Sequence, residues 1–323
     1  MTTLANDSDA AASSSSRPRG GLGLALTSAT AFGLSGAFAR PLLEAGWSAG
    51  AVVLLRIAVG ALVVLPFGVA ALRGRWILLR RNAPTVLLYG VLAVAGAQFC
   101  YFSAVRTMEV GPALLIEYTA PAAVVGWMWL VHGQRPGRLT VLGALVAAAG
   151  LLLVLDLFSG ARFDAAGAAW ALAAMVGAAA YFVISADDSG GLPPLALAAG
   201  GLVVGGVLLG LLGLVGLMPL DAVGTHVEYA GLLVAPWVPL LLLGLVTAAL
   251  AYVTGIAAGR RLGSRLASFV ALSEVVLAVV WAWVLLGELP SLVQLGGGLL
   301  ILLGVVGVKL GERTVAREEP VLT

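Results

Sequence analysis

Three ionisable residues lie deep inside long apolar stretches of the sequence: Arg56, Glu117 and Glu274. A charge at bilayer depth costs about 2.5–3.5 kcal/mol on insertion scales, so each side chain should face a cavity or a partner. The two carboxylates could bind a cationic group of a substrate or exchange a proton with it. The alternative is structural, in which Arg56 or backbone donors hold a buried carboxylate and lock neighbouring helices together.

A second set of polar side chains could line the same site or only join helices by weak hydrogen bonds. Gln98 and Tyr101 share a helix face because they are three residues apart. Tyr118 and Tyr181 could stack on a substrate or bond to it. Tyr252 and Ser273 complete the candidate substrate- or proton-binding set, because they coincide with Gln98 and Thr119 in the internal alignment described below.

Helix breakers near these residues predict flexible points. Pro121 follows Glu117 closely, and proline frees backbone carbonyls inside a helix. Gly33 and Gly36 should loosen the first apolar segment. We expect no metal site, because the only two histidines are far apart and lie in expected loops, and no disulfide, because Cys100 is the single cysteine. We also expect no cofactor.

Membrane-spanning helices must position these residues, because 61% of the chain is hydrophobic, 11% is charged and the mean hydropathy is +1.06. We expect an all-α membrane protein, in which each apolar run of roughly 20 residues crosses the bilayer as a helix. The ten predicted spans are 21–41, 48–72, 84–105, 111–131, 139–156, 165–185, 192–217, 237–258, 263–286 and 292–310.

The basic residues predict the orientation. With the N-terminus inside, the outer side holds only Arg40, Arg106 and Arg162, and Arg56 lies within a span. The other 14 of the 18 basic residues fall on the cytoplasmic side, which places both termini in the cytoplasm. These 14 are Arg17, Arg19, Arg73, Arg75, Arg80, Arg81, Arg135, Arg138, Arg260, Arg261, Arg265, Lys309, Arg313 and Arg317.

The sequence also resembles itself at a separation of 154 residues. Rare residue types then coincide: Arg106 with Arg260, Trp127 with Trp281, Trp129 with Trp283, Gly133 with Gly287, Pro136 with Pro290, and Gly90, Gly143 and Gly150 with Gly244, Gly297 and Gly304. Five spans per copy make the second copy enter from the opposite side, which is typical of secondary transporters. We therefore predict a disordered cytoplasmic tail at 1–20, inverted five-helix repeats at 21–156 and 157–310, and a cytoplasmic tail at 311–323.

Residues 101–105, 113–121 and 285–290 (YFSAV, ALLIEYTAP and LLGELP) resemble the EamA-domain branch of the drug/metabolite transporter superfamily, as do Arg56 and the Gly143–Gly150 pattern. The resemblance implies ten helices around a central cavity, and an exporter or exchanger of amino acids, metabolites or drugs. The run IEYTAP is similar to threonine/homoserine exporters. The branch's usual Glu-Pro pair in the ninth span is here Glu274-Val275, and its Gly-Glu after the fourth span is Gly133-Gln134.

These features favour a secondary active transporter of a small amphipathic or zwitterionic metabolite or drug, working by alternating access in the bacterial plasma (inner) membrane. One arginine against two glutamates favours neutral, zwitterionic or cationic cargo. The expected partners are that small molecule and the lipid bilayer, without nucleic acid. Proton coupling stays open, as does the choice between monomer and homodimer. An intramembrane enzyme acting on a lipid-linked substrate and a passive channel remain alternatives, although no catalytic pair or ATPase motif is visible.

Overall fold

The computed structural model describes residues 6–105, 107, 110–154, 164–229, 231–287 and 289–318 of the chain. Within these residues, nine helical segments are long and apolar enough to cross a membrane. They are Gly20–Glu44, Ala49–Leu72, Ala83–Ala104, Ala113–His132, Ala165–Ala186, Pro194–Leu214, Trp237–Leu262, Ser264–Leu286 and Leu292–Gly311. The remaining predicted span is a shorter apolar helix, Arg138–Val154, of 17 residues.

The elements of the first half are α1 (Asn6–Glu44), α2 (Ala49–Leu72), α3 (Trp76–Arg81), α4 (Ala83–Leu88), the π-helix η1 (Tyr89–Gly96), α5 (Ala97–Val105), α6 (Val110–Glu117), α7 (Ala120–His132) and α8 (Arg138–Val154). Those of the second half are α9 (Ala165–Ala186), α10 (Pro194–Leu214), β1 (Val227–Tyr229), β2 (Leu232–Val234), α11 (Trp237–Leu242), the π-helix η3 (Leu243–Leu250), α12 (Ala251–Leu262), α13 (Ser264–Ala271), α14 (Ser273–Leu286) and α15 (Leu292–Glu318).

Local sequence explains where several helices begin and end. Ser48 caps α2 by accepting a hydrogen bond from the Ala51 amide, and Asp164 caps α9 by accepting one from the Gly167 amide at 2.6 Å. Gly133 and Gly287 end α7 and α14 with positive φ angles of 69° and 73°, which glycine adopts without steric cost.

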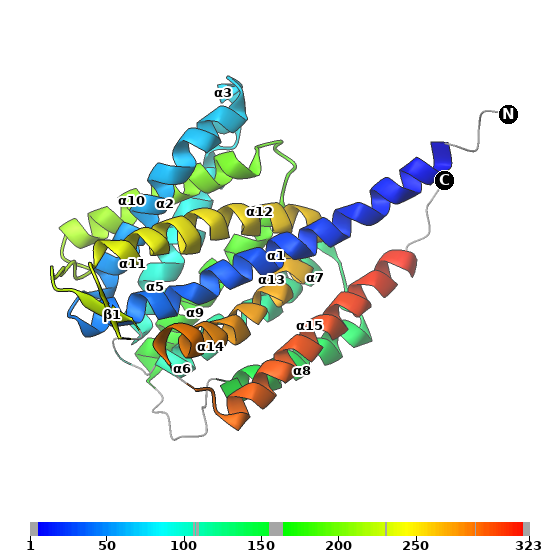
Figure 1. Ribbon diagram of the computed structural model, residues 1–323. Coiled ribbons are helices and arrows are strands. Elements are labelled where there is room, and N and C mark those ends of the chain that lie inside the picture. The colour runs from blue at the N-terminus through cyan, green and yellow to red at the C-terminus, as the bar shows by residue number, and fades with distance from the viewer. Residues whose placement is uncertain are drawn as a thin grey trace.

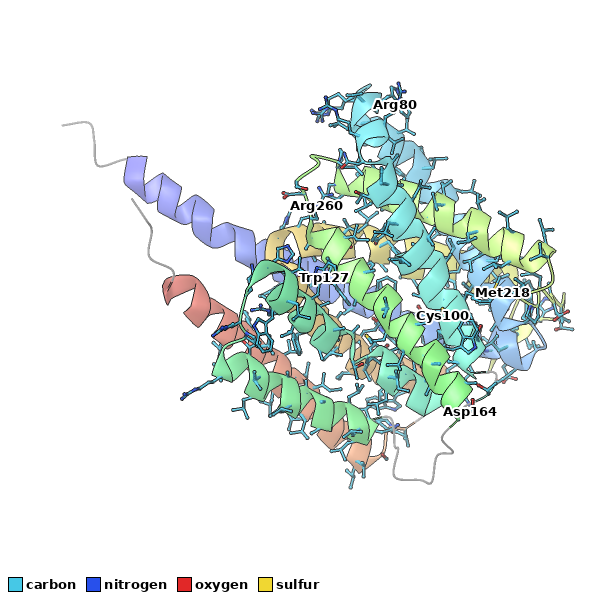
Figure 2. The ribbon with its side chains drawn as sticks, turned by 180° about the vertical axis from the view of Figure 1, so that it is seen from behind. Arg80, Cys100, Trp127, Asp164, Met218 and Arg260 are labelled. Atoms are coloured by element: carbon cyan, nitrogen blue, oxygen red, sulfur yellow. The ribbon has the colours of Figure 1, made fainter. Side chains whose placement is uncertain are left out.

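The helices pack into a bundle in which α1 lies between α12 and α14 (Figure 1). From behind, α9 crosses the molecule and packs against η1, α5, α6 and α7 (Figure 2). Arg80, on the short helix α3, lies at one tip of the molecule, far from the other labelled residues (Figure 2). One large buried core joins α2, η1, α10 and α12, and a second joins α8, α13, α14 and α15.

Helices α8 and α15 lie side by side at one edge of the bundle (Figure 1) and approach through glycines. A Cβ atom at Gly150 would lie 2.5 Å from the carbonyl oxygen of Gly297, and one at Gly143 would lie 2.7 Å from that of Gly304. Only residues without a side chain allow this approach, as is usual where helices pack in membranes. The 17-residue helix α8 is thereby held against a full-length span.

The structure differs from the sequence-based expectations at two places. Helix α1 begins at Asn6 and α15 continues to Glu318, so helix extends into the segments 1–20 and 311–323, because adding residues to an existing helix is far easier than starting one. The loop before α11 contains the antiparallel hairpin β1–β2, so the fold is nearly, and not wholly, helical. Arg106 and Arg162, which we expected on the outer side, lie outside the described residues.

Candidate functional site

A cavity of about 990 Å³ lies within the bundle. Its wall is mostly apolar and comes mainly from α1, α2, α5, α6, α7, α9, α12, α13 and α14. The cavity contains all three intramembrane ionisable residues, which is the arrangement expected for charges that cannot face lipid. Eleven of the twelve site residues expected from the sequence line it: Glu117, Glu274, Arg56, Gln98, Tyr101, Tyr118, Tyr181, Tyr252, Pro121, Gly33 and Gly36.

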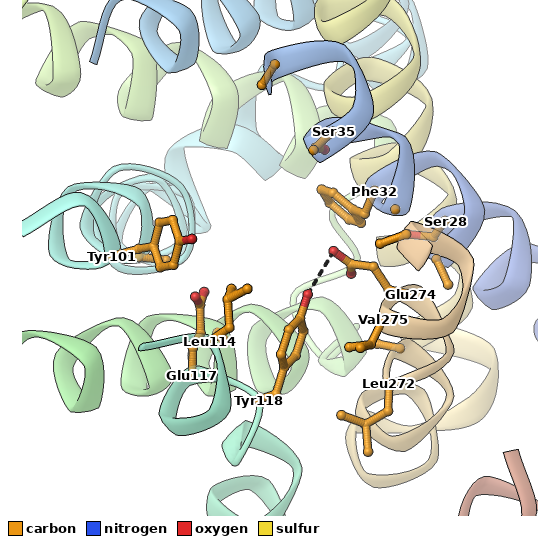
Figure 3. Close-up of a pocket in the computed structure, with 18 of the residues that line it drawn as sticks. Ser28, Phe32, Ser35, Tyr101, Leu114, Glu117, Tyr118, Leu272, Glu274 and Val275 are labelled. Carbon is orange, nitrogen blue, oxygen red and sulfur yellow. Dashed lines mark hydrogen bonds between the residues drawn. The ribbon is translucent and has the colours of Figure 1, made fainter. Parts of the chain in front are cut away.

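Glu117 is the last residue of α6, where the fourth span breaks. Pro121 explains the break, because proline has no N–H to donate to the carbonyl four residues earlier, which belongs to Glu117. Tyr118 and Thr119 form the turn before α7 begins at Ala120. Figure 3 shows the carboxylate of Glu117 directed into the cavity on the same side as Tyr101.

Glu274 lies on the other side of the cavity, in the first turn of α14 (Figure 3). The hydroxyl of Tyr118 donates a hydrogen bond to its Oε1 atom at 3.3 Å. Helix α1 packs directly on this turn, because a Cβ atom at Gly33 would lie 3.1 Å from the Glu274 carbonyl oxygen and from the Ala278 amide nitrogen. Gly33 therefore allows a close approach of two helices, and α1 runs unbroken through it and through Gly36.

Arg56 is 7% exposed and projects from α2 toward η3. Its Nη2 donates to the carbonyl oxygen of Thr247 at 2.7 Å, and its guanidinium lies 5.7 Å from the ring centroid of Phe32. Its Nε has no hydrogen-bond partner among the described residues. No described carboxylate forms an ion pair with Arg56, so the expected structural alternative of an Arg56–glutamate lock is not what holds this side chain.

Aromatic rings form the wall beside Arg56. Phe32 lies edge-on to Tyr252 and Tyr181, with ring centroids 5.3 and 6.3 Å away. Tyr181 and Tyr252 are themselves 5.7 Å apart. The hydroxyl of Tyr181 is buried, and it lies close to the side chain of Ser28 on α1.

Ser273 is the one expected site residue that does not line the cavity. It is 3% exposed, and its hydroxyl donates to the carbonyl oxygen of Val270, three residues earlier. Thr119 makes the equivalent bond to Ile116 at 2.6 Å. The two hydroxyls therefore satisfy carbonyls at the ends of α6 and α13, and their match in the internal alignment reflects a shared helix break.

The candidate residues predicted from the sequence included Gly33 and Gly36 of α1 but not its polar and aromatic side chains. Ser28, Phe32 and Ser35 line the cavity, and their spacing of four and three residues puts them on one helix face. This spacing was the available signal, since Ser28 and Ser35 are polar residues inside an apolar helix. The Ser28 hydroxyl donates to the Ala251 carbonyl oxygen at 2.9 Å, and the buried Ser35 hydroxyl has no partner among the described residues.

The two ends of the cavity differ. At one end its wall reaches Arg40, Leu43, Leu289 and Pro290, near the C-terminal ends of α1 and α14. At the other end it stops at small residues, including Ala25, Ala258 and Ser268.

Beyond this second end the helices meet tightly. A Cβ atom at Gly21 of α1 would lie 2.8 Å from the side chain of Leu262 on α12. Arg260 donates to the Leu192 carbonyl oxygen before α10, and Arg265 donates to the Gln134 carbonyl oxygen after α7 at 3.0 Å. These contacts close one end of the cavity.

Two known proteins are similar to this chain in sequence. The chain is 27% identical over 274 residues to the threonine/homoserine exporter RhtA of Salmonella typhimurium (strain SL1344), covering 83% of both chains. It is 25% identical over 241 residues to the uncharacterized inner membrane transporter YicL of Salmonella typhimurium (strain LT2), covering 74% of this chain and 77% of the relative.

A solved crystal structure of a protein has the same fold, with a TM-score of 0.74 and 22% identity, covering 91% of this chain and 98% of the other. The model of the EamA-like transporter family matches the chain twice, at residues 19–156 and 165–310. These two matches cover most of the sequence and both of its halves. The chain is therefore a multi-pass membrane protein of the EamA-like transporter family.

Proposed function

We propose that this transporter is a secondary active exporter or exchanger of a small zwitterionic metabolite, such as an amino acid, and that it works by alternating access. One observation carries the proposal: a single cavity holds Arg56, Glu117 and Glu274, none of which forms an ion pair with another described residue. Buried charges without an opposite charge beside them are costly, so a ligand carrying both signs of charge would compensate them.

The placement of the charges suggests how such a ligand would bind. Its carboxylate would approach the guanidinium group of Arg56, and its ammonium group would approach Glu117 across the cavity. The rings of Phe32, Tyr181 and Tyr252 would contact its apolar part. The threonine/homoserine exporter among the relatives is named for cargo of this charge type.

Alternating access is supported by backbone features that recur at the predicted separation of 154 residues. The π-helices Tyr89–Gly96 and Leu243–Leu250 occupy equivalent positions, and so do the helices Val110–Glu117 and Ser264–Ala271. The α8–α15 contacts are reciprocal as well, since Gly143 meets the equivalent of Gly150, and Gly150 meets the equivalent of Gly143. Ten crossing helices in two inverted repeats account for these features.

The orientation is part of the proposal. The closed end of the cavity carries Arg260 and Arg265, together with the loops that follow α7 and α9. If the positive-inside rule holds for this chain, this end is cytoplasmic, both termini are inside and the membrane is the bacterial plasma membrane. The described conformation is then one whose cavity reaches toward the outer side.

Counterflow into proteoliposomes tests the proposal. Vesicles loaded with an unlabelled compound receive a trace of the labelled compound outside, and uptake is measured for amino acids and for the matching amines and carboxylic acids that lack one charge. We expect saturable exchange of the amino acids only. A channel would instead give uptake that does not saturate.

Glu117→Gln should raise the half-saturation concentration about tenfold or more, because a hydrogen bond to a charged group contributes about 1.5–3 kcal/mol. Glu228→Gln, the same change on an exposed residue of β1, is the matched control and should leave exchange unchanged. If no compound exchanges and Glu117→Gln alters nothing, the proposed function is wrong.

A further inference from the structure

The fourth and ninth crossing segments are each broken beside the cavity. The break between α6 and α7 lies at Tyr118 and Thr119, and the break between α13 and α14 lies at Leu272. At each break a backbone amide donates a hydrogen bond to the carbonyl oxygen three residues earlier, as in a 3₁₀ turn. The Thr119 amide donates to the Ile116 carbonyl, and the Leu272 amide donates to the Phe269 carbonyl. Such short turns change direction more easily than a continuous α-helix.

Tyr118 connects the two breaks. It belongs to the first break, and its ring packs on the buried cluster that contains Leu272 and Val275 of the second. Its hydroxyl bonds to Glu274, two residues beyond the second break (Figure 3). A single side chain thus ties together two turns that are 154 residues apart in sequence.

The surroundings of Glu274 make this bond sensitive to charge. The ionisable groups close enough to interact with it are Arg56 from α2, Glu117 from α6, Tyr118 itself, Tyr181 from α9 and Tyr252 from α12. Among the described residues, only the Tyr118 hydroxyl donates a hydrogen bond to the carboxylate. Helix α1, packed through Gly33, contacts the backbone of the same turn.

Glu117 is placed differently, although it lines the same cavity. Its carboxylate has no side-chain hydrogen bond among the described residues and faces the cavity beside Tyr101 (Figure 3). Glu117 is free to bind cargo, whereas Glu274 is engaged with a helix break. A change in the charge of Glu117 would therefore affect the binding of cargo, whereas a change in the charge of Glu274 would affect the contact between the two helix breaks.

We propose that Tyr118 is a positioning residue that transmits the charge state of Glu274 to both helix breaks. This proposal rests on the proposed transport function and assigns separate roles to its two carboxylates. With Glu274 ionised, the charge-assisted bond holds the breaks together and keeps the inner end closed. When Glu274 accepts a proton, the bond becomes a weaker neutral one, and the segments around the breaks are released to open the inner end.

Labelling of single cysteines tests this without knowledge of the cargo. In a Cys100→Ala background, Ala39→Cys reports on the outer end of the cavity wall and Ala25→Cys on the inner end. Each is labelled with a soluble maleimide in proteoliposomes at a series of pH values between roughly 5.5 and 8.5. We expect the ratio of inner to outer labelling to rise as the pH falls.

Tyr118→Phe removes only the hydroxyl, and Tyr89→Phe makes the same change at a buried tyrosine of η1 that does not line the cavity, as a matched control. Tyr118→Phe should raise the labelling ratio about fivefold at high pH and abolish its pH dependence, because the charge-assisted bond is lost at every pH. Tyr89→Phe should keep both the ratio and its pH dependence. Glu274→Gln should resemble Tyr118→Phe, and combining the two should add little beyond either change alone.

Three outcomes would overturn the proposal. These are a parental ratio that does not respond to pH, a Tyr118→Phe variant that behaves like the parent, and a double variant whose effect is the sum of the single ones. Tyr118→Phe keeps the ring on its apolar cluster, and elution as a single peak in gel filtration verifies folding. Because labelling needs no substrate, a failure of counterflow alone would refute the proposed cargo and leave the role of Tyr118 to be decided by labelling.

Discussion

Replacing Gly297 by alanine should loosen the pair formed by α8 and α15. A Cβ atom at this position would lie 2.7 Å from the carbonyl oxygen of Gly150 and 2.8 Å from the Cβ atom of Leu153. Ordinary contacts begin at 3.4 Å, so the atoms at 2.7 Å would have to separate by about 0.7 Å. The nearest obstacle is backbone, which cannot rotate away as a side chain could.

The expected cost follows from two opposing contributions. Overpacking a close contact costs about 1–3 kcal/mol, and a separation of 0.5–1 Å loses about a quarter to a half of each affected van der Waals contact. The higher helix propensity of alanine returns about 1 kcal/mol. We therefore expect Gly297→Ala to lower the free energy of unfolding by up to about 2 kcal/mol, because α8 depends mainly on α15 for its packing.

Gly296→Ala is the matched control on the same helix. Apart from its chain neighbours and the backbone of its own helix, no atom lies within 4 Å of a Cβ atom built at Gly296, so the change should be neutral or slightly stabilising. Both variants are unfolded by titrating detergent-solubilised protein with sodium dodecyl sulfate while intrinsic tryptophan fluorescence is recorded. A Gly297→Ala variant as stable as Gly296→Ala would refute the glycine-mediated packing of α8 on α15.

Two further changes test other parts of the structure. Gly255→Ala should lower counterflow about tenfold, because the new methyl group would overlap the Tyr181 hydroxyl. Gly36→Ala, on the same cavity wall, is the control and should leave counterflow unchanged, because a methyl group there meets no atom within 4 Å. In the loop after α9, the backbone N–H of Ser189 bonds to Asp187 at 2.9 Å and holds the pKa of that carboxyl below its usual value. The bond between Ser189 and Asp187 therefore stabilises the folded protein at pH values above the unfolded pKa of about 3.9. This stabilisation is lost as the pH falls through the lower pKa that Asp187 has in the folded protein. The melting temperature of Asp187→Asn should accordingly lie below that of the parent at neutral pH and approach it in acid.

Much of the fold could be read from residue type alone. Nine of the ten expected spans match helices of sufficient length and apolarity, with ends within a few residues, because backbone in lipid must satisfy its own hydrogen bonds as helix. The interruptions within the spans could not be read in full. Pro121 indicated the break in the fourth span, but no proline marks the break at Leu272 or the π-helices at Tyr89 and Leu243.

The candidate site was predictable to a similar degree. Arg56, Glu117 and Glu274 could be found because charge inside an apolar segment is costly and so requires a cavity or a partner. Ser273 was assigned to the cavity by its match with Thr119, yet its hydroxyl bonds to its own helix. Sequence spacing gives the face of a residue, but not whether a neighbouring carbonyl already occupies its hydroxyl.

The sequence alone is enough to predict that this protein lies in lipid, where its crossing segments are and which charges within them are costly, because each of these depends on the residues of one segment. Which groups meet one another depends on the tertiary structure. It placed Arg56 on the Thr247 carbonyl and not on a glutamate, left Glu117 facing the cavity, and brought Tyr118 to Glu274. Such pairings depend on distances between helices that are far apart in the chain, and no local pattern of residues encodes those distances.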